Sequence, residues 1–397
     1  MNEFAFQPTG RIFTEREALL EEWTPNQLVG RDTELRTYHA ALQPVIEGET
    51  PSNIFLYGKS GVGKTAATRF LLRQLEQDAQ HVEGVSLHTI EINCDGLNTS
   101  YQTAVRLVNE LRPPESQISN TGYPQSSVYN FLFDELDALG GTILIVLDEV
   151  DHIEDDSLLY KLPRARSNGD VKEARLGIIG ISNDLRFRNQ LSSKVRSSLC
   201  EKEVSFAAYN ADELREVLRQ REQVAFYDDV VDEGVIHACA AYGAKDSGDA
   251  RQALDLLLES GDIAREANAE QVVESHVQTA RRRLQTDQVV QGIANYPTHG
   301  KLVLLALTVL AEQGQTPART RDVRPAYKSI CSQEGTDPIS NRALREYLSE
   351  LETLGIVSSA EKNKGKGGGK YKLHSLAQSP ESVRRGLADL LVDSPSV

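Results

Sequence analysis

The sequence has few cysteines and no long hydrophobic run. Four cysteines occur among 397 residues, and they lie far apart without a C-x-x-C pair: Cys94, Cys200, Cys239 and Cys331. That spacing argues against a zinc site and against a disulfide framework, and it favours a reducing compartment. No apolar run approaches the roughly 20 residues that a membrane span needs, and the first residues lack the order of a secretory signal. We therefore expect a cytoplasmic protein that does not enter a membrane.

Positive charge is also scarce, and it is unevenly distributed. The formal net charge is −15, yet residues 289–397 hold 14 Lys and Arg against 11 Asp and Glu, a balance of +3. Five lysines fall in one short segment near the end: Lys362, Lys364, Lys366, Lys370 and Lys372. An acidic body with localised lysine fits either a salt-rich cytoplasm or ordinary solubility charge. The basic C-terminal part is the candidate for contact with nucleic acid.

What the sequence does contain is one specific motif, GKSGVGKT at 58–65. It fits G-x-x-x-x-G-K-[ST] and lies between a predicted buried strand at 52–57 and a predicted helix at 66–75. In this context backbone N–H groups surround phosphates at a helix N-terminus, Lys64 reaches the outer phosphates and Thr65 holds magnesium. A glycine-rich turn without a nucleotide is the alternative. The predicted cradle is Gly58, Lys59, Ser60, Gly61, Val62, Gly63, Lys64, Thr65 and Ala66.

Two further predicted strands end in polar residues. The apolar run 143–147 is followed by Asp148 and Glu149. Because carboxylates at the end of a buried strand need a cation or hydrogen bonds, we expect Asp148 to hold Mg²⁺ and Glu149 to polarise an attacking water. A second run, 176–181, precedes Asn183. Its amide could orient that water against a γ-phosphate, or the residue could simply form a turn.

The order of elements predicts the domain organisation. Strands are also expected at 85–93 and 199–206, with helices between the strands, which predicts an α/β domain with a parallel sheet. From 210 to about 286 the pattern is helical only, and Arg251 falls in the first turn of one helix. We expect four parts: a mobile N-terminal arm at 1–24 with a short helix at 14–22, a nucleotide-binding domain at 25–207, a helical domain at 208–288 and a basic domain at 289–397.

The last part of the sequence predicts three helices and a basic hairpin. The helices are expected at 301–312, 321–331 and 340–354, and two short strands flank the segment EKNKGKGGG. This order describes a winged helix, whose third helix enters a major groove of DNA while the wing contacts phosphate or the minor groove. A solvated lysine loop is the alternative. The predicted DNA contacts are Asn341, Arg342, Arg345, Lys364, Lys366 and Lys370.

The motifs and their order resemble the archaeal replication initiators related to the origin recognition complex and the cell-division-control loader, a branch of the AAA+ ATPases. The similar segments span nearly the whole chain: PSNIFLYGKSGVGKT, LDEVD, SNDL, VRSSL, GDARQALDLL and HGKLVLLAL. The resemblance implies an AAA+ P-loop parallel-sheet domain with an all-α lid and a C-terminal winged-helix domain, and ATP or ADP with Mg²⁺ as cofactors. It also implies double-stranded origin DNA and a replicative helicase as partners, a homo-oligomer on DNA and a nucleoid-associated location.

The resemblance also implies roles for single residues. Asn183 corresponds to the first sensor, and Arg251 to a second sensor that reaches the γ-phosphate from the lid. Residues 97–139 resemble the helical insertion with which the family contacts DNA. The remaining residues placed near the nucleotide, the first three of them near adenine, are Val29, Gly30, Arg31, Tyr209 and Arg221.

One position departs from the family pattern. The family usually has Arg directly before the Val of its V-x-S-S-L segment, where this sequence has Lys194. Arg196, two positions later, is the candidate for the arginine that acts in trans on a neighbouring subunit. The departure implies that hydrolysis is slow or dispensable.

Three functions fit these observations. The first is an ATP-dependent initiator that recognises replication origins and recruits the helicase, with slow ATP hydrolysis as a switch. The second is a nucleotide-gated winged-helix transcription regulator or signalling ATPase, which predicts an additional sensor or repeat domain that this sequence does not show. The third is a helicase or clamp loader, against which the winged helix argues. We therefore expect the initiator.

Overall fold

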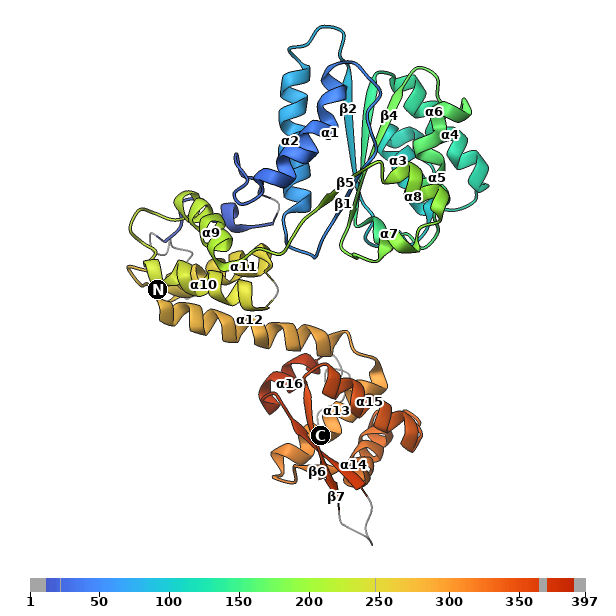
Figure 1. Cartoon of the computed structure of the whole chain (residues 1–397). Helices are drawn as coiled ribbons and strands as arrows, with labels where there is room; N and C mark the ends of the chain where they lie inside the picture. Colours follow the sequence, from blue (N-terminus) through green and yellow to red (C-terminus); the bar gives the residue numbers. More distant parts are fainter. Residues whose placement is uncertain (1–11, 22, 247, 364–369, 389–397) are drawn as a thin grey trace. The chain divides into compact units, whose positions relative to one another are not determined.

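The computed structural model describes residues 12–21, 23–246, 248–363 and 370–388. The chain divides into two compact units, residues 1–277 and 278–397 (Figure 1). Helix α12 (Glu274–Ala294) crosses the division. Within the described ranges, no helix has both the length and the apolar character needed to cross a bilayer.

A five-stranded parallel sheet forms the centre of the first unit. Its order is β2-β3-β4-β1-β5, and every pairing in it is parallel. The carboxyl ends of the strands therefore meet at one edge of the sheet. The strands are β1 (Ile54–Tyr57), β2 (Leu87–Asn93), β3 (Thr142–Asp148), β4 (Arg175–Ser182) and β5 (Lys202–Ser205).

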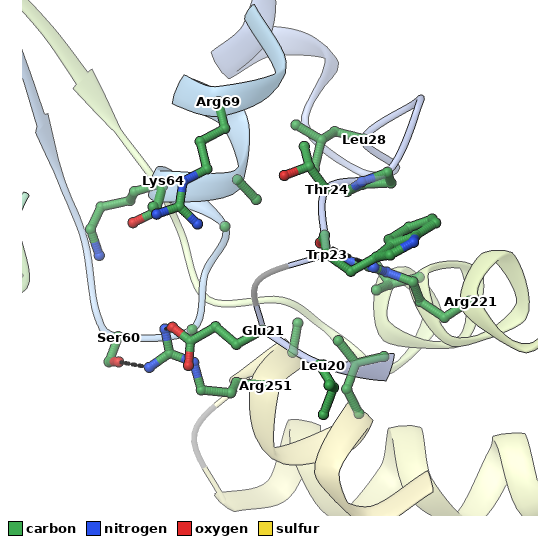
Figure 2. A pocket seen from close by; sticks show the side chains of 18 of the residues that line it. Leu20, Glu21, Trp23, Thr24, Leu28, Ser60, Lys64, Arg69, Arg221 and Arg251 are labelled. Atoms are coloured by element: carbon green, nitrogen blue, oxygen red, sulfur yellow. Dashed lines mark hydrogen bonds and ion pairs between the residues drawn. The ribbon is translucent and has the colours of Figure 1, made fainter. Parts of the chain in front are cut away.

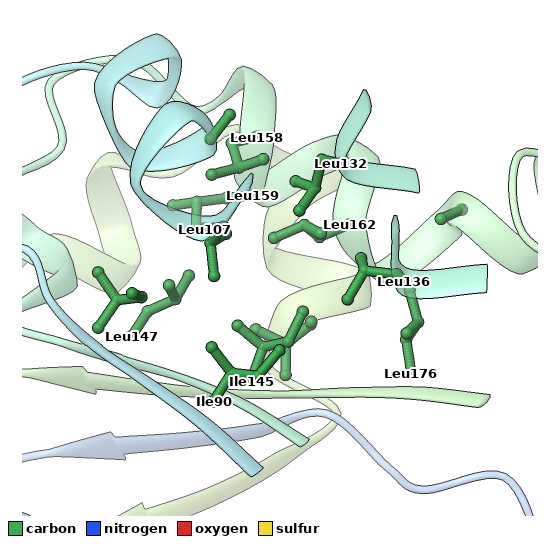
Figure 3. Packing of buried hydrophobic residues seen from close by; sticks show 14 of the residues in the cluster. Ile90, Leu107, Leu132, Leu136, Ile145, Leu147, Leu158, Leu159, Leu162 and Leu176 are labelled. Carbon is green, nitrogen blue, oxygen red and sulfur yellow. The ribbon is translucent and has the colours of Figure 1, made fainter. Parts of the chain in front are cut away.

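Helices cover both faces of this sheet (Figure 1). Alternate residues of β3 explain why: Ile145 packs into one hydrophobic cluster and Val146 into another on the opposite face. Figure 3 shows the first cluster, in which leucines of several helices pack onto Ile90 and Ile145. The helices are α1 (Asp32–Ile46), α2 (Lys64–Ala79), α3 (Ser100–Leu111), α4 (Gln125–Leu139), α5 (Ser157–Lys161), α6 (Ala165–Asn168), α7 (Phe187–Gln190) and α8 (Ser193–Leu199).

The rest of the first unit is helical. It contains α9 (Ala211–Ala225), α10 (Glu233–Asp246) and α11 (Ala250–Glu266). Asn210 and Glu213 form a capping box that starts α9, because each side chain accepts a hydrogen bond from backbone N–H groups at this helix end.

The segment before residue 25 differs from the helix expected there. It forms only a four-residue 3-10 helix, η1 (Arg16–Leu19), and packs on the helical part of the unit. The Thr14 N–H donates to the carbonyl of Ala225 at 2.9 Å, and the ring of Phe13 lies 4.8 Å from that of Phe226. Such contacts join residues about 200 positions apart, so no local pattern predicts them.

The second unit contains the predicted helices and hairpin. Its helices are α13 (Thr298–Glu312), α14 (Thr320–Gln333), α15 (Asn341–Thr353) and α16 (Pro380–Gly386). Its strands are β6 (Ala318–Arg319), β7 (Val357–Asn363) and β8 (Lys370–Leu376), which form an antiparallel sheet in the order β6-β8-β7. Helix α15 buries Leu344, Leu348 and Leu351 in a core that it shares with α13. Lys364 and Lys366 lie outside the described residues.

Candidate functional site

The glycine-rich loop connects β1 to α2 and contacts the start of α11. Gly61 and Gly63 have φ angles of 70° and 92°, the left-handed conformation that glycine adopts most readily. A Cβ atom on Gly61 would collide with the carboxylate of Asp249, and the Ala250 N–H donates to the Gly61 carbonyl at 3.0 Å. The loop therefore needs glycine here both for its conformation and for its contact with the helical part of the unit.

Lys64 is buried at the point where the loop meets β4. Its Nζ atom donates to the carbonyls of Gly58 at 2.9 Å and Lys59 at 2.7 Å, and to Oδ1 of Asn183 at 2.8 Å. The residue is 4% exposed. Burial lowers the pKa of Lys64 to about 8, although Asp148 and Asp151 oppose the effect. An anion that approached this ammonium would meet a positive charge with little water around it.

Thr65 and Asp148 form a pair of oxygen ligands beside Lys64. The Thr65 hydroxyl donates to Oδ2 of Asp148 at 2.7 Å, and Oδ1 of Asp148 accepts from the N–H of Glu149 at 2.9 Å. Burial raises the pKa of Asp148 above its usual value. A hydroxyl and a carboxylate held this close are ligands of the type that Mg²⁺ takes in proteins, so these residues fit the expected metal.

Glu149 and Asn183 lie together at the ends of neighbouring strands. The Asn183 amide Nδ2 donates to Oε1 of Glu149 at 3.2 Å, and its backbone N–H donates to Asp151 at 3.0 Å. Glu149 has a φ angle of 55°, which a residue with a side chain rarely adopts. Strain of this kind is concentrated at functional sites, where the surrounding structure holds one side chain in a required direction.

Arg251 faces the loop from α11. Asp249 caps this helix by accepting the Arg251 N–H at 2.8 Å. The guanidinium NH1 donates to the Ser60 hydroxyl at 3.3 Å, and NH2 forms an ion pair with Glu21 (Figure 2). The second predicted sensor therefore lies beside the loop.

Most of the predicted nucleotide-site residues line one pocket, part of which is drawn in Figure 2. The pocket lies within the first unit, between the carboxyl edge of the sheet, the helical part and the N-terminal segment. Predicted residues that line it are Val29, Ser60, Gly61, Gly63, Lys64, Thr65, Ala66, Asp148, Glu149, Asn183, Tyr209, Arg221 and Arg251. Predicted residues absent from its lining are Gly30, Arg31, Gly58, Lys59, Val62 and Arg196.

Arg31 lies behind the loop. It is 2% exposed, donates from Nε to the Val62 carbonyl at 3.1 Å and from NH2 to the Ala207 carbonyl at 2.8 Å. Its guanidinium carbon lies 3.7 Å from the centre of the Tyr209 ring. These contacts give Arg31 a structural task, which is to hold the loop against the segment that follows β5.

Arg221 contacts the N-terminal segment. NH1 donates to the carbonyls of Ala18 at 2.9 Å and Trp23 at 3.2 Å, and its guanidinium carbon lies 4.2 Å from the centre of the Trp23 ring. Burial lowers the pKa of Arg221 to about 10. Sequence reasoning missed the pocket residues of the N-terminal segment, which carry no motif: Leu19, Leu20, Glu21, Trp23, Thr24 and Pro25.

The candidate trans-acting residues lie on α8, away from this pocket. Arg196 is partly buried and Lys194 is exposed. The Lys194 carbonyl accepts a hydrogen bond from Arg164 at 3.1 Å. Whether either residue acts on a second copy stays a prediction.

A basic groove occupies one side of the second unit. It is lined by Arg319, Thr320, Arg321, Arg345, Ser349, Lys370, Tyr371, Lys372 and His374. The predicted contacts Arg345 and Lys370 lie in it, whereas Asn341 and Arg342 are exposed on α15 outside its lining. Sequence reasoning missed Arg319, whose guanidinium carbon lies 4.1 Å from the centre of the Tyr371 ring, because the two-residue strand β6 gives no periodic signal.

A P-loop at the carboxyl edge of a parallel sheet, faced by an arginine from a helical part, defines an AAA ATPase. Family models agree: the AAA ATPase domain matches residues 27–171, the Cdc6 AAA+ ATPase-type lid domain 215–282, and the CDC6 C-terminal winged helix domain 291–386. The predicted fold class is thereby confirmed. Membership in this class implies that the chain binds a nucleotide.

The chain belongs to the ORC1-type DNA replication proteins of archaea. It is 54% identical to ORC1-type DNA replication protein 11 of Haloarcula marismortui over 388 residues, which cover 98% of this chain and 94% of the relative. It is 47% identical to ORC1-type DNA replication protein 10 of Halobacterium salinarum over 391 residues, 98% of this chain and 94% of that one. The chain is therefore a DNA replication initiator, and the predicted family is confirmed.

Solved structures agree with this assignment. The Aeropyrum pernix ORC1 protein in complex with DNA matches with a TM-score of 0.79 and 36% identity, over 96% of this chain and 98% of that one. Cdc6p from Pyrobaculum aerophilum matches with a TM-score of 0.58 and 19% identity, over 96% of this chain and all of that one, which supports the fold alone.

Proposed function

We propose that this initiator binds origin DNA in an ATP-dependent manner and recruits the replicative helicase. The observation that supports the proposal most strongly is the convergence of Lys64, Thr65, Asp148, Asn183 and Arg251 on one pocket. Asp148 ends β3 and Asn183 follows the neighbouring strand β4, while Lys64 and Thr65 begin α2. Arg251 comes from the helical part, so a nucleotide between them would contact both parts. The nucleotide state would then control how the helical lid sits on the sheet domain.

In this proposal a triphosphate lies along the loop. Lys64 exchanges its carbonyl partners for the outer phosphates, and Arg251 reaches the γ-phosphate from the lid. Thr65 and Asp148 would hold Mg²⁺, which neutralises part of the phosphate charge. Glu149 and Asn183 orient a water molecule toward the γ-phosphate, since their side chains are already hydrogen-bonded to each other at 3.2 Å.

Hydrolysis would act as a switch. Loss of the γ-phosphate would remove its contacts with Asn183 and Arg251 and so release the lid. Each hydrolysis of ATP would change the lid position once, so slow hydrolysis is sufficient for such a switch. Arg196 would complete the site in trans if the protein forms a homo-oligomer on DNA.

We further propose that the basic groove binds duplex DNA. The A. pernix ORC1 protein, which is 36% identical, is in complex with DNA in its solved structure. With α15 in a major groove, the exposed Arg345 would reach base edges, and Arg319, Arg321 and Lys370 would contact the backbone. Residues 97–139 would supply a second contact, and a protein bound in this way would be associated with the nucleoid.

Footprinting on fragmented genomic DNA from the host tests the proposal. Protection should appear at discrete sites that share a repeated motif near replication origins, and the pattern should differ between ATP and ADP. Uniform protection of all fragments, or a pattern indifferent to the nucleotide, would count against ATP-dependent origin binding. Protection confined to promoters would favour a transcription regulator.

A further inference from the structure

The N-terminal segment, residues 12–21 and 23–25, is attached to the helical lid. Besides its backbone bond to Ala225, Thr14 donates from Oγ1 to the Val224 carbonyl at 2.7 Å. Arg16 pairs with Asp262 of α11 at 2.7 Å, and Phe13 packs where Gly261 has no side chain. These contacts involve α9 and α11, so the segment belongs structurally to the lid that faces the loop.

This attachment brings a carboxylate into the candidate nucleotide pocket. Glu21 lines the pocket together with Lys64 and Thr65, and it forms an ion pair with NH2 of Arg251. The other terminal nitrogen of Arg251 donates to Ser60 of the loop. Asp148 and Glu149 fit a metal ion and a water molecule, but Glu21 lies beside the arginine expected to meet the γ-phosphate, where its charge repels the anion that the pocket would bind.

We propose that Glu21 is a specificity-determining residue that competes with the γ-phosphate for Arg251 and thereby weakens the binding of ATP relative to ADP. The inference rests on the proposed function, since it requires that both nucleotides bind in this pocket. A γ-phosphate that pairs with Arg251 must displace the Glu21 carboxylate and leave it close to another anion. ADP lacks the phosphate that reaches Arg251, so it leaves the Glu21–Arg251 pair intact.

The exchange has a structural consequence for the N-terminal segment. While Glu21 is paired with Arg251, residues 12–21 are held to the lid at two places, by Phe13, Thr14 and Arg16 near their start and by Glu21 at their end. When ATP takes Arg251, only the contacts of Phe13, Thr14 and Arg16 remain. The position of Glu21 should therefore differ between the two nucleotides.

Glu21→Gln in the full chain tests the inference, because it removes the charge and keeps the shape. We expect the dissociation constant of a nonhydrolysable ATP analogue, measured calorimetrically with Mg²⁺, to fall about three- to fivefold. The constant for ADP should stay the same. Glu17→Gln is the matched control, since Glu17 is exposed on the same segment and does not line the pocket, and it should change neither constant.

The chain provides a second readout. Trp23 is the only tryptophan in the sequence and lines the same pocket. Its fluorescence should change more with the ATP analogue than with ADP in the wild type, and Glu21→Gln should shift the midpoint for the ATP analogue alone.

Three results would overturn the inference. Equal changes for ATP analogue and ADP would mean that Glu21 only supports the segment. Glu21→Gln should also be combined with Arg251→Ala. If Glu21→Gln then raises the affinity for the ATP analogue as much as it does when Arg251 is present, Glu21 repels phosphate directly and does not compete for Arg251. If the wild type binds neither nucleotide, the proposed function fails as well. This outcome is distinguishable because the Glu17→Gln control would then show no binding either.

Discussion

The nucleotide pocket and the basic groove present positive charge in opposite ways. In the pocket, Lys64 is 4% exposed and each of its hydrogen bonds is to an oxygen of the loop or of Asn183. In the groove, Lys370 and Lys372 are largely exposed and paired with Glu361 at 3.4 Å and Glu352 at 3.0 Å. The pocket fixes the ammonium of Lys64 in one position, whereas the groove offers several cations that can change partners.

The difference teaches what each region can recognise. A buried, fixed ammonium suits a small anion of defined shape, because its binding energy depends on geometry and on low local solvation. Exposed ion pairs contribute about 0 to 1 kcal/mol each, so little free energy is lost when they break as DNA binds or gained when they form again as DNA dissociates. Sequence specificity in the groove must then come from residues that read base edges or DNA shape.

Replacing the buried cation should have the largest effect. We expect Lys64→Ala to weaken ATP binding by about 3 kcal/mol, more than a hundredfold in the dissociation constant, because nothing else in the loop supplies a charge at that point. Calorimetric titration measures the change. Lys328→Ala, which removes an exposed lysine of the second unit, is the control and should leave ATP affinity unchanged. A loss below tenfold would contradict the comparison.

Removing the arginine that faces DNA from α15 should have a smaller effect. Arg345→Ala should weaken binding to the protected origin motif by about 1–3 kcal/mol if its guanidinium reads a base, with much less loss on unrelated DNA. Competition binding with both DNAs separates these cases. Arg319→Ala, by contrast, should weaken both DNAs alike, since backbone contacts carry no sequence information.

Removing an acid that pairs with a lysine of the groove should strengthen DNA binding slightly. Glu352 pairs with Lys372, so Glu352→Gln should free that lysine and tighten binding by about 0.2–1 kcal/mol. The gain should be largest at low salt and vanish as ionic strength rises, because counterions screen exposed charges. A titration series over salt concentration measures it. A gain in affinity that does not depend on salt would show that Lys372 does not exchange Glu352 for a DNA phosphate.

The smallest effect concerns His374, the buried titratable group of the groove. It is 3% exposed and lies between the hydroxyls of Thr320 at 3.1 Å and Ser359 at 2.9 Å. Burial lowers the pKa of His374 below its usual 6.5, and Lys372 adds to this while Glu352 opposes it. In the unfolded chain the imidazole therefore takes up a proton at higher pH than in the folded chain, so stability is complete above about pH 6.5 and falls as the pH decreases below it.

Thermal unfolding of the full chain between pH 5 and 8 tests this expectation. The transition of the wild type should move to lower temperature below about pH 6.5, and His374→Gln should reduce that shift. An equal shift in both proteins would assign the pH dependence to other groups.

The central part of the candidate nucleotide site could be predicted because its signals are local. The loop motif identifies Lys64 and Thr65, and apolar runs that end in Asp148 and Asn183 identify strand ends. Parallel pairing then brings those ends to the same edge of the sheet, as the register of β1, β3 and β4 shows. Chain topology therefore converts separate motifs into one pocket.

The outer wall of the pocket could not be predicted in this way. Glu21 and Trp23 reach it because Phe13, Thr14 and Arg16 pack on helices more than 200 residues away. Such packing depends on complementary shapes, for example an aromatic ring above Gly261, and leaves no periodic trace in the sequence. The resemblance to a family implies that Arg31 lies near adenine, which stays a prediction; the structure adds that its side chain donates to the Val62 carbonyl of the loop.

The pocket takes its lining from residues as distant in the sequence as Trp23, Ser60 and Arg251. A version of the protein trimmed to begin at residue 26 would retain every recognisable motif and still lack one side of its binding cleft. Truncations at the amino end therefore remove part of the cleft even though they leave every motif intact.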